Sequence, residues 1–129
     1  MCEPYVLLRE DVEYLDAHFP ERWHKLSEGS GKHALLIEEF EIPNGFAQEK
    51  ADLMILIPSG YPGVGLDMFY FNPSLQKPNN QEVEAIALEE HFNRSWQRWS
   101  RHYTWIPGEH NLYLHIEFVR NELETAGSK

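Results

Sequence analysis

The chain has one cysteine, Cys2, among its 129 residues. A single thiol cannot form an internal disulfide, and it cannot supply the ligands of a cysteine-rich zinc site. The seven histidines include no pair at i, i+4 spacing and no His-Glu-x-x-His pattern. These absences exclude a secreted disulfide scaffold, and we expect no bound metal.

Long apolar runs and nucleotide-binding motifs are also missing. No run approaches the ~18–20 apolar residues that a membrane helix requires. Residues 1–11 contain no basic segment before an apolar stretch, so we expect no signal peptide. Gly63-Val64-Gly65 is too short for a glycine-rich phosphate loop. We therefore expect no cofactor, no association with a membrane, and a cytoplasmic location.

What the chain does have is an excess of acid, 21 acidic against 11 basic residues, for a formal net charge of -10. Nucleic acid and anionic membranes are polyanions, so this charge opposes binding to either. The fractions of hydrophobic residues (42%) and charged residues (25%) are those of an ordinary globular domain. We expect a single domain over residues 1–129, frayed at residues 1–6 and 125–129.

The hydrophobic pattern predicts a helix, a set of strands and a second helix. A helix is expected over residues 8–19, where apolar positions recur at spacings of three and four until Pro20. The expected strands are 22–26, 33–42, 51–57 and 67–71. Residues 74–90 are ambiguous but fit one short helical turn at Val83, Ile86 and Ala87, and the last helix is expected over 110–123. This order predicts an α+β fold, with helices packed on an antiparallel meander of about four strands.

The most unusual segment spans residues 91–108. It contains no acidic residue, yet it carries three arginines and three of the four tryptophans: Arg94, Arg98, Arg101, Trp96, Trp99 and Trp105. Arginine beside tryptophan suits cation–π stacking and the recognition of carboxylates. One interpretation is an irregular binding or active-site loop. The other, which is compatible with it, is a loop pinned by its tryptophans, with arginines paired to acids elsewhere.

His102 and Ser100 are candidate reactive groups within this segment. A histidine can act as a general base near neutral pH, and a serine two residues away makes a Ser–His pair conceivable. The alternative for His102 is a structural hydrogen bond in a loop. A further alternative, which the net charge opposes, is a single-stranded nucleic-acid module that uses the arginines and tryptophans.

Three pieces of the chain together resemble ubiquitin-conjugating enzymes. Ala51–Ile57, the Tyr61-Pro62 turn and Leu66–Phe71 are similar to the strand, Tyr-Pro turn and next strand of those enzymes. Trp105-Ile106-Pro107, followed by an apolar helix, resembles their Trp-x-Pro segment. The resemblance covers residues 7–124 and implies the ubiquitin-conjugating (UBC) fold.

Within that superfamily the chain is identified as a member of prokaryotic family E. The hallmark of the family is similar to Leu66-Asp67-Met68-Phe69-Tyr70 followed by residues 95–102. The resemblance implies a conjugating-enzyme-like component of a bacterial ubiquitin-like modification pathway. Its partners would be a ubiquitin-like protein, an activating enzyme and a JAB-type peptidase.

The chain departs from conjugating enzymes at the residue that defines their chemistry. Those enzymes carry ubiquitin as a thioester on a cysteine before the Trp-x-Pro, and no cysteine lies between Tyr61 and Trp105. Their upstream His-Pro-Asn is also missing. The family is described as having a histidine in place of the cysteine, and His102 fits that position best. Cys2, ahead of the first helix, is not expected to replace it.

Three mechanisms remain open for such a loop. The protein can be a scaffold in which His102 is a polar contact. Alternatively, His102 can be the general base for an amine or hydroxyl that attacks a thioester on the activating enzyme. In the third, Ser100 or Ser95 carries an oxyester with His102 as base. We favour the first two because an oxyester is less reactive than a thioester.

The resemblance also implies a place for the tail of the ubiquitin-like protein. Arg98 and Arg101, with Trp99, would hold the carboxylate at its C-terminus through charge-assisted hydrogen bonds. The alternative function belongs to another class of protein, a non-catalytic adaptor that binds the ubiquitin-like protein or its activating enzyme.

Overall fold

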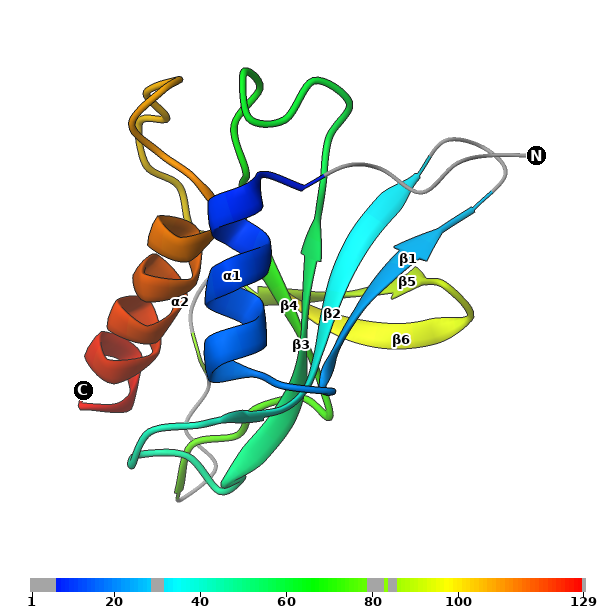
Figure 1. Cartoon of the computed structure of the whole chain (residues 1–129). Coiled ribbons are helices and arrows are strands. Elements are labelled where there is room, and N and C mark those ends of the chain that lie inside the picture. Colours follow the sequence, from blue (N-terminus) through cyan, green and yellow to red (C-terminus); the bar gives the residue numbers. More distant parts are fainter. Residues whose placement is uncertain (1–6, 29–31, 79–82, 84–85, 129) are drawn as a thin grey trace.

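The computed structural model describes residues 7–28, 32–78, 83 and 86–128. Its elements, in chain order, are α1 (Arg9–His18), β1 (Trp23–Ser27), β2 (His33–Glu41), β3 (Lys50–Leu56), β4 (Phe69–Asn72), β5 (Ile86–His91), β6 (Arg94–Trp99) and α2 (Leu112–Gly127). Figure 1 shows α1 and α2 side by side on the same side of the sheet. The expected α+β class, with a helix at each end of the strand region, is confirmed.

The strands that the structure describes form one antiparallel sheet of six, in the order β1-β2-β3-β4-β6-β5. The first four follow one another as a meander, as expected. β3 lies inside the sheet and is apolar on both faces, so Leu53, Met54 and Ile55 have no exposed surface. The chain then passes from β4 to the edge strand β5 and returns through β6.

The expected number of about four strands is too low, because β5 and β6 were not predicted. Ile86 and Ala87, assigned to a helical turn, pair instead with Trp99 and Arg98 in the β5–β6 ladder. The segment 91–108 is likewise not an irregular loop throughout, because it includes the last residue of β5, the turn at 92–93 and the whole of β6. The irregular part begins only after β6 and runs to the start of α2.

The two tryptophans of β6 explain why its sequence lacks the alternating hydrophobic pattern that predicts a strand. Trp96 and Trp99 are three residues apart, so in an extended strand they point to opposite faces. Trp99 joins the main core between sheet and helices, whereas Trp96 joins a second cluster with Ala34, Met54 and Tyr70. Both rings are almost fully buried, and a strand buried on both faces shows no alternation of apolar and polar residues.

The helix boundaries differ only at their ends from those expected. α1 lies within the predicted 8–19, and α2 continues to Gly127, past Leu123 and into the stretch expected to fray. The side chain of Asn111 caps α2 by accepting a hydrogen bond from the Leu114 N–H. Residues 1–6, with Cys2, and Lys129 lie outside the described residues. No helix in the described part of the chain is long and apolar enough to span a membrane.

Candidate functional site

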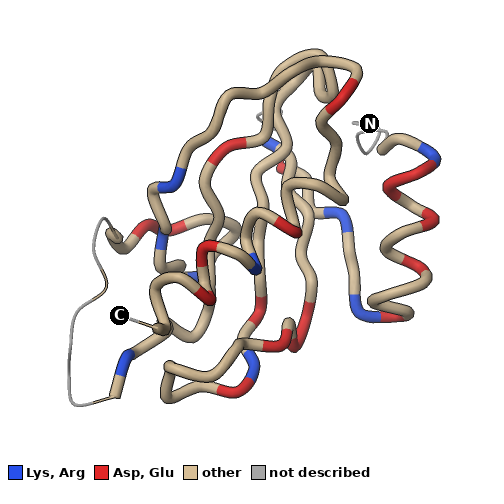
Figure 2. Tube along the Cα trace, turned by 90° about the vertical axis from the view of Figure 1, so that its left-hand side faces the viewer, with Lys and Arg blue, Asp and Glu red and all other residues tan. Residues whose placement is uncertain are grey.

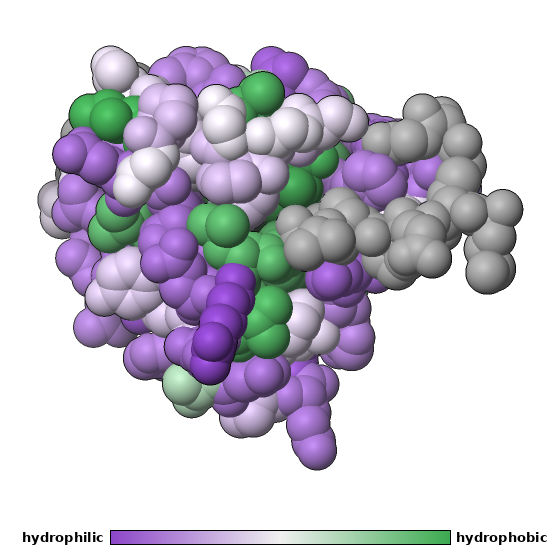
Figure 3. Space-filling model, turned by 45° about the horizontal axis from the view of Figure 1, so that its top comes forward, coloured by the Kyte–Doolittle hydropathy of each residue, from purple (hydrophilic) through white to green (hydrophobic). Residues whose placement is uncertain are grey.

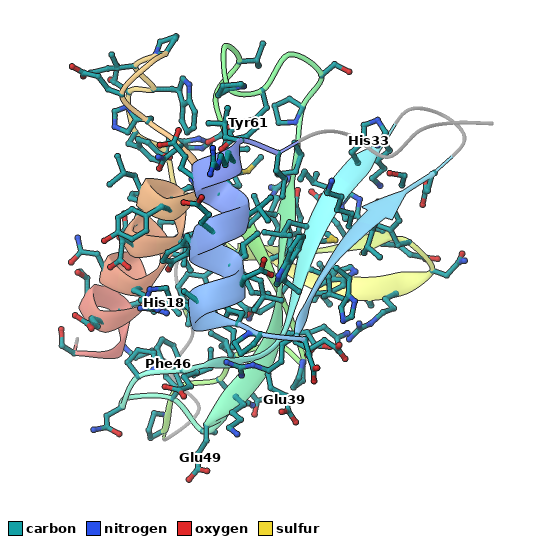
Figure 4. All side chains as sticks on the ribbon, in the orientation of Figure 1. His18, His33, Glu39, Phe46, Glu49 and Tyr61 are labelled. Carbon is teal, nitrogen blue, oxygen red and sulfur yellow. The ribbon has the colours of Figure 1, made fainter. Side chains whose placement is uncertain are left out.

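Three segments that are distant in the sequence meet at one end of the molecule. The loop between β3 and β4 and the loop between β6 and α2 both lie there, beside the first turns of α1 and α2 (Figure 1). Tyr61, labelled in Figure 4, lies over the start of α1. Figure 3, which brings this end forward, shows apolar patches interrupted by polar surface.

His102 and Asp67 form an exposed pair at this end. Asp67 comes just before β4 and His102 just after β6, and these strands are neighbours in the sheet. The distance from His102 Nδ1 to Asp67 Oδ1 is 2.6 Å, and the side chains are 63% and 52% exposed. A carboxylate can only accept, so Nδ1 carries the proton and donates. The lone pair of the neutral ring is then on Nε2, which lies on an exposed side chain.

A buried histidine fixes the backbone beside this pair. His115, on α2, has no exposed surface, and its Nε2 donates to the Met68 carbonyl at 3.0 Å. The Tyr103 hydroxyl donates to its Nδ1 at 2.7 Å. Burial lowers the pKa of His115 to about 4, so the ring is neutral at neutral pH. Met68 adjoins Asp67, and its N–H donates to the Arg101 carbonyl next to His102.

Burial also raises the pKa of Tyr103, with a smaller contribution from the charge of Asp67. The phenol therefore keeps its proton and can donate it to His115. This hydrogen-bond chain runs from the β6–α2 loop through α2 to the residue adjoining Asp67. These hydrogen bonds fix the backbone next to Asp67 and next to His102.

A second buried network joins both helices to the Tyr-Pro turn. Asp11, on α1, has no exposed surface and accepts from the Tyr61 hydroxyl at 2.5 Å. The Leu112 N–H, in the first turn of α2, donates to Asp11 at 3.1 Å and to the Tyr61 oxygen at 2.7 Å. Burial raises the pKa of the Asp11 carboxyl, and the hydrogen bonds from Tyr61 and Leu112 oppose that shift.

The Trp-x-Pro segment packs on the same turn. Trp105 Nε1 donates to the Pro62 carbonyl at 2.9 Å, and its ring lies 6.0 Å from that of Tyr61. A Cβ atom on Gly65 would lie 2.6 Å from Trp105, so this position requires glycine. The Tyr-Pro and Trp-x-Pro pieces, which are 43 residues apart, thus form one packed unit in the fold.

The model of the family described as prokaryotic E2 family E matches residues 7–126. The chain belongs to this family. No curated protein and no solved structure matches the chain. Membership supports a conjugating-enzyme-like role in a ubiquitin-like modification pathway. The segments on which the resemblance rests, from Ala51 to Phe71 and from Ser95 to the end of the expected apolar helix at Leu123, all lie within the match.

Two of the arginines in this E2-family chain pair with acids on other strands. Arg98 binds Glu89 of β5, and Arg94 binds Asp52 of β3 at 3.1 Å. This agrees with the interpretation in which the arginines of the segment find acids elsewhere. The trace in Figure 2 shows how widely acidic positions are spread, including several along α1. Arg101 lies 4.9 Å from the ring centre of Trp99, and its Nη1 donates to the Ser100 carbonyl at 3.2 Å.

The proposed tail-binding residues are therefore not equivalent. Trp99 is completely buried, so its ring cannot contact the tail directly and can act only by packing against the Arg101 guanidinium. The Arg98 side chain is 32% exposed and is engaged by Glu89. Arg101, next to His102 in the chain, is half-buried.

The structure does not bring Ser100 and His102 together. Among contacts between described residues, no hydrogen bond joins the Ser100 hydroxyl to the His102 ring, whose Nδ1 bonds to Asp67. Asn72, all that remains of the His-Pro-Asn motif, donates to the Ser95 carbonyl and accepts from Arg94. These contacts give Asn72 a role in holding β4 to β6.

Sequence reasoning missed Asp67, Asp11 and His115 as members of the site. Asp67 stands within the hallmark, but the sequence alone does not pair it with His102, 35 residues away. Asp11 and His115 each interrupt the apolar stripe of a predicted helix, and a polar residue on such a stripe requires a buried partner. Within the described part of the chain, no group of three or more His, Cys, Asp and Glu residues could hold a metal ion.

Proposed function

We propose that the Asp67–His102 pair is the reactive centre of a conjugating-enzyme-like protein in which His102 acts as a general base. The observation that carries this proposal is the 2.6 Å contact between His102 Nδ1 and Asp67, made on two exposed side chains. The carboxylate orients the ring and fixes its tautomer, which leaves Nε2 to receive a proton.

The reaction that we propose starts from a thioester between the C-terminus of a ubiquitin-like protein and a thiol of its activating enzyme. An amine nitrogen bonds to the thioester carbonyl carbon, and the carbon–sulfur bond breaks. His102 Nε2 takes a proton from that nitrogen, and Asp67 stabilises the imidazolium, as in a Ser-His-Asp triad. The imidazolium then returns the proton to the departing thiolate. The products are an amide and a free thiol.

His102 suits this role better than that of a covalent carrier. An acyl-imidazole hydrolyses readily, so a ubiquitin-like protein would be lost to water. An oxyester on Ser100 would need His102 as its base, and the ring is oriented by Asp67 rather than by Ser100. We therefore place the thioester on the activating enzyme throughout.

Arg101 is the residue that we propose for binding the tail, with Trp99 and Arg98 in support. Its guanidinium lies against the Trp99 ring and donates from Nη1 to the Ser100 carbonyl at 3.2 Å, and these contacts restrict its position. Arg98 adds a second cation near the end of β6, although its side chain is paired with Glu89. The ubiquitin-like protein and the activating enzyme are the partners in this proposal. A JAB-type peptidase would reverse the modification, and all four proteins would work in the cytoplasm.

A non-catalytic adaptor is the second candidate, favoured by one observation. Cys2 is the only cysteine of the chain, so no thioester can form within residues 7–126 that match the family. An adaptor would accelerate transfer by holding the activating enzyme and the ubiquitin-like protein together. Its effect would depend on binding and not on the imidazole of His102.

The test measures discharge of the activating-enzyme thioester to a free amine such as lysine, in the presence and absence of this protein. We expect His102→Ala to lower the acceleration by about 100-fold, the lower range for a lost general base, with binding to the activating enzyme unchanged. If the protein is an adaptor, the His102→Ala variant should accelerate discharge as much as the unsubstituted protein.

The chain offers a matched control for this substitution. His24 and Glu38 form another exposed His–carboxylate pair, with side chains 47% and 49% exposed, on β1 and β2. His24→Ala removes the same chemical group at a site away from the β6–α2 loop, and we expect it to leave discharge unchanged. An equal loss in both variants would contradict the assignment of His102.

A further inference from the structure

A groove of about 350 Å³ extends from Asp67 across the end of the sheet. Its lining is mainly apolar, and Leu56, Ile57 and Met68 contribute to it. Asp67 and Lys32 both line the groove, so one open space extends from the carboxylate member of the proposed reactive pair to Lys32. Lys32 is half-buried and directly precedes β2.

Lys32 contacts an imidazole rather than a carboxylate. Its Nζ donates to Nδ1 of His91, at the end of β5, and lies 5.3 Å from the ring centre of Phe92. His91 Nε2 lies 2.8 Å from Glu89 Oε1. An ammonium group only donates and a carboxylate only accepts, so the ring proton is on Nε2 and Nδ1 faces the lysine.

Glu89 is itself held in place from two other strands. It accepts from the Tyr70 hydroxyl at 3.3 Å and from Arg98. The hydrogen bond from His91 is the main cause that lowers the pKa of Glu89, so the carboxylate remains charged. The His91 side chain is only 13% exposed. The chain Lys32–His91–Glu89 therefore has the order of a nucleophile, its base and an orienting carboxylate.

A lysine with only a structural role would not need an imidazole between its ammonium group and the carboxylate. A lysine that only stabilised the fold would gain most by contacting Glu89 directly, because Coulomb attraction needs opposite charges at close range. Here a ring with one free lone pair stands between the two charges. That ring can accept a proton from Lys32, and the carboxylate behind it stabilises the resulting cation.

We propose that Lys32 is a site of covalent self-modification, where its amine accepts the tail of the ubiquitin-like protein with His91 as base and Glu89 as a positioning residue. This inference rests on the proposed function, since it requires a thioester presented at the Asp67 side of the groove. His91 is a catalytic residue in this step because it contacts the reacting nitrogen.

The proposed step balances as follows. The Lys32 ammonium passes one proton to His91 Nδ1 and becomes a neutral amine. Its nitrogen bonds to the thioester carbonyl carbon, and the carbon–sulfur bond to the activating enzyme breaks. The departing thiolate takes the second proton from the nitrogen. The products are an isopeptide on Lys32, a free thiol and a protonated His91.

The first experiment incubates the full chain with its activating enzyme, a ubiquitin-like protein and ATP, and locates adducts by mass spectrometry. We expect Lys32 to be modified about 100-fold faster than Lys50, an exposed lysine on β3, since a general base contributes at least that factor. Lys32→Arg should abolish the main adduct while Lys50→Arg leaves it. An even spread over the other lysines would overturn the inference.

The second experiment tests the base by chemical rescue. His91→Ala should lower the initial rate of Lys32 modification about 100-fold, and imidazole in the buffer should restore part of it without accelerating the unsubstituted protein. Glu89→Gln, which keeps a hydrogen-bond acceptor for His91, should lower the rate less. If imidazole restores nothing to a folded His91→Ala variant, His91 is not the base.

The two proposals fail in different ways. His102→Ala should lose discharge to free lysine but keep the Lys32 adduct, because the two amines use different bases. If discharge depends on His102 and no Lys32 adduct forms, the proposed function stands and the self-modification fails. If discharge does not depend on His102, the proposed function fails, whatever the adducts show.

Discussion

At the scale of single residues, the site depends on histidines in opposite environments. His102 is exposed and paired with Asp67, whereas His115 is fully buried between Tyr103 and the Met68 carbonyl. The sequence provides the residue types and their order. It does not say which histidine is buried, because that depends on how α2 packs against the strand end before β4.

The buried histidine gives stability a defined dependence on pH. The pKa of His115 falls to about 4 in the fold, against ~6.5 in an unfolded chain. Between these values the unfolded state binds more protons, so stability is full above pH ~6.5 and falls as the pH drops to 4. The difference corresponds to about 3 kcal/mol.

Urea unfolding at pH 7 and pH 4.5 measures this loss. His115→Gln cannot titrate, so we expect its stability at pH 7 to be lower but to fall less on acidification than that of the unsubstituted protein. Comparing the two proteins cancels the contributions of the titratable groups that they share. Parallel losses would show that folding does not lower the pKa of His115.

At the scale of elements, the sequence predicts best those whose pattern comes from one buried face. Residues 8–19 and 110–123 have apolar residues at helical spacing, and both form helices. The β5–β6 hairpin was missed because β6 buries Trp96 and Trp99 on opposite faces of the sheet. Its partner β5 has no fully buried residue. Neither strand therefore shows a clear alternation of apolar and polar positions.

The two helices are joined at their first turns by Asp11. Removing its carboxylate in Asp11→Ala leaves the half-buried Tyr61 without the acceptor of its hydroxyl and the Leu112 N–H with one partner instead of two. We expect the free energy of unfolding to fall by about 2–3 kcal/mol, as measured by urea denaturation.

Glu13→Ala is the control within the same helix. Glu13 binds Arg9 with side chains 66% and 93% exposed, and exposed pairs of this kind stabilise little. We expect a change within about 0.5 kcal/mol. Equal losses for the two variants would show that Asp11 does not link the helices to the Tyr-Pro turn.

At the scale of the whole molecule, the fold explains how a strongly acidic chain carries a segment without acids. Arg98 of β6 binds Glu89 of the neighbouring β5. Arg94 binds Asn72 of the neighbouring β4 and Asp52 of β3, one strand further. The class, the helices and four strands followed from the sequence. The pairing of Asp67 with His102 did not, since 35 residues separate them and only the adjacency of β4 and β6 brings them together.

The most direct test of the central claim is a double-mutant cycle on Asp67 and His102. Single-turnover discharge to free lysine is measured for His102→Ala, Asp67→Asn and the double variant. If Asp67 acts only through the His102 ring, the double variant is no slower than His102→Ala alone, because residues that act as a unit are not additive. If the two losses multiply, or if neither substitution slows discharge, the pair is not the reactive centre.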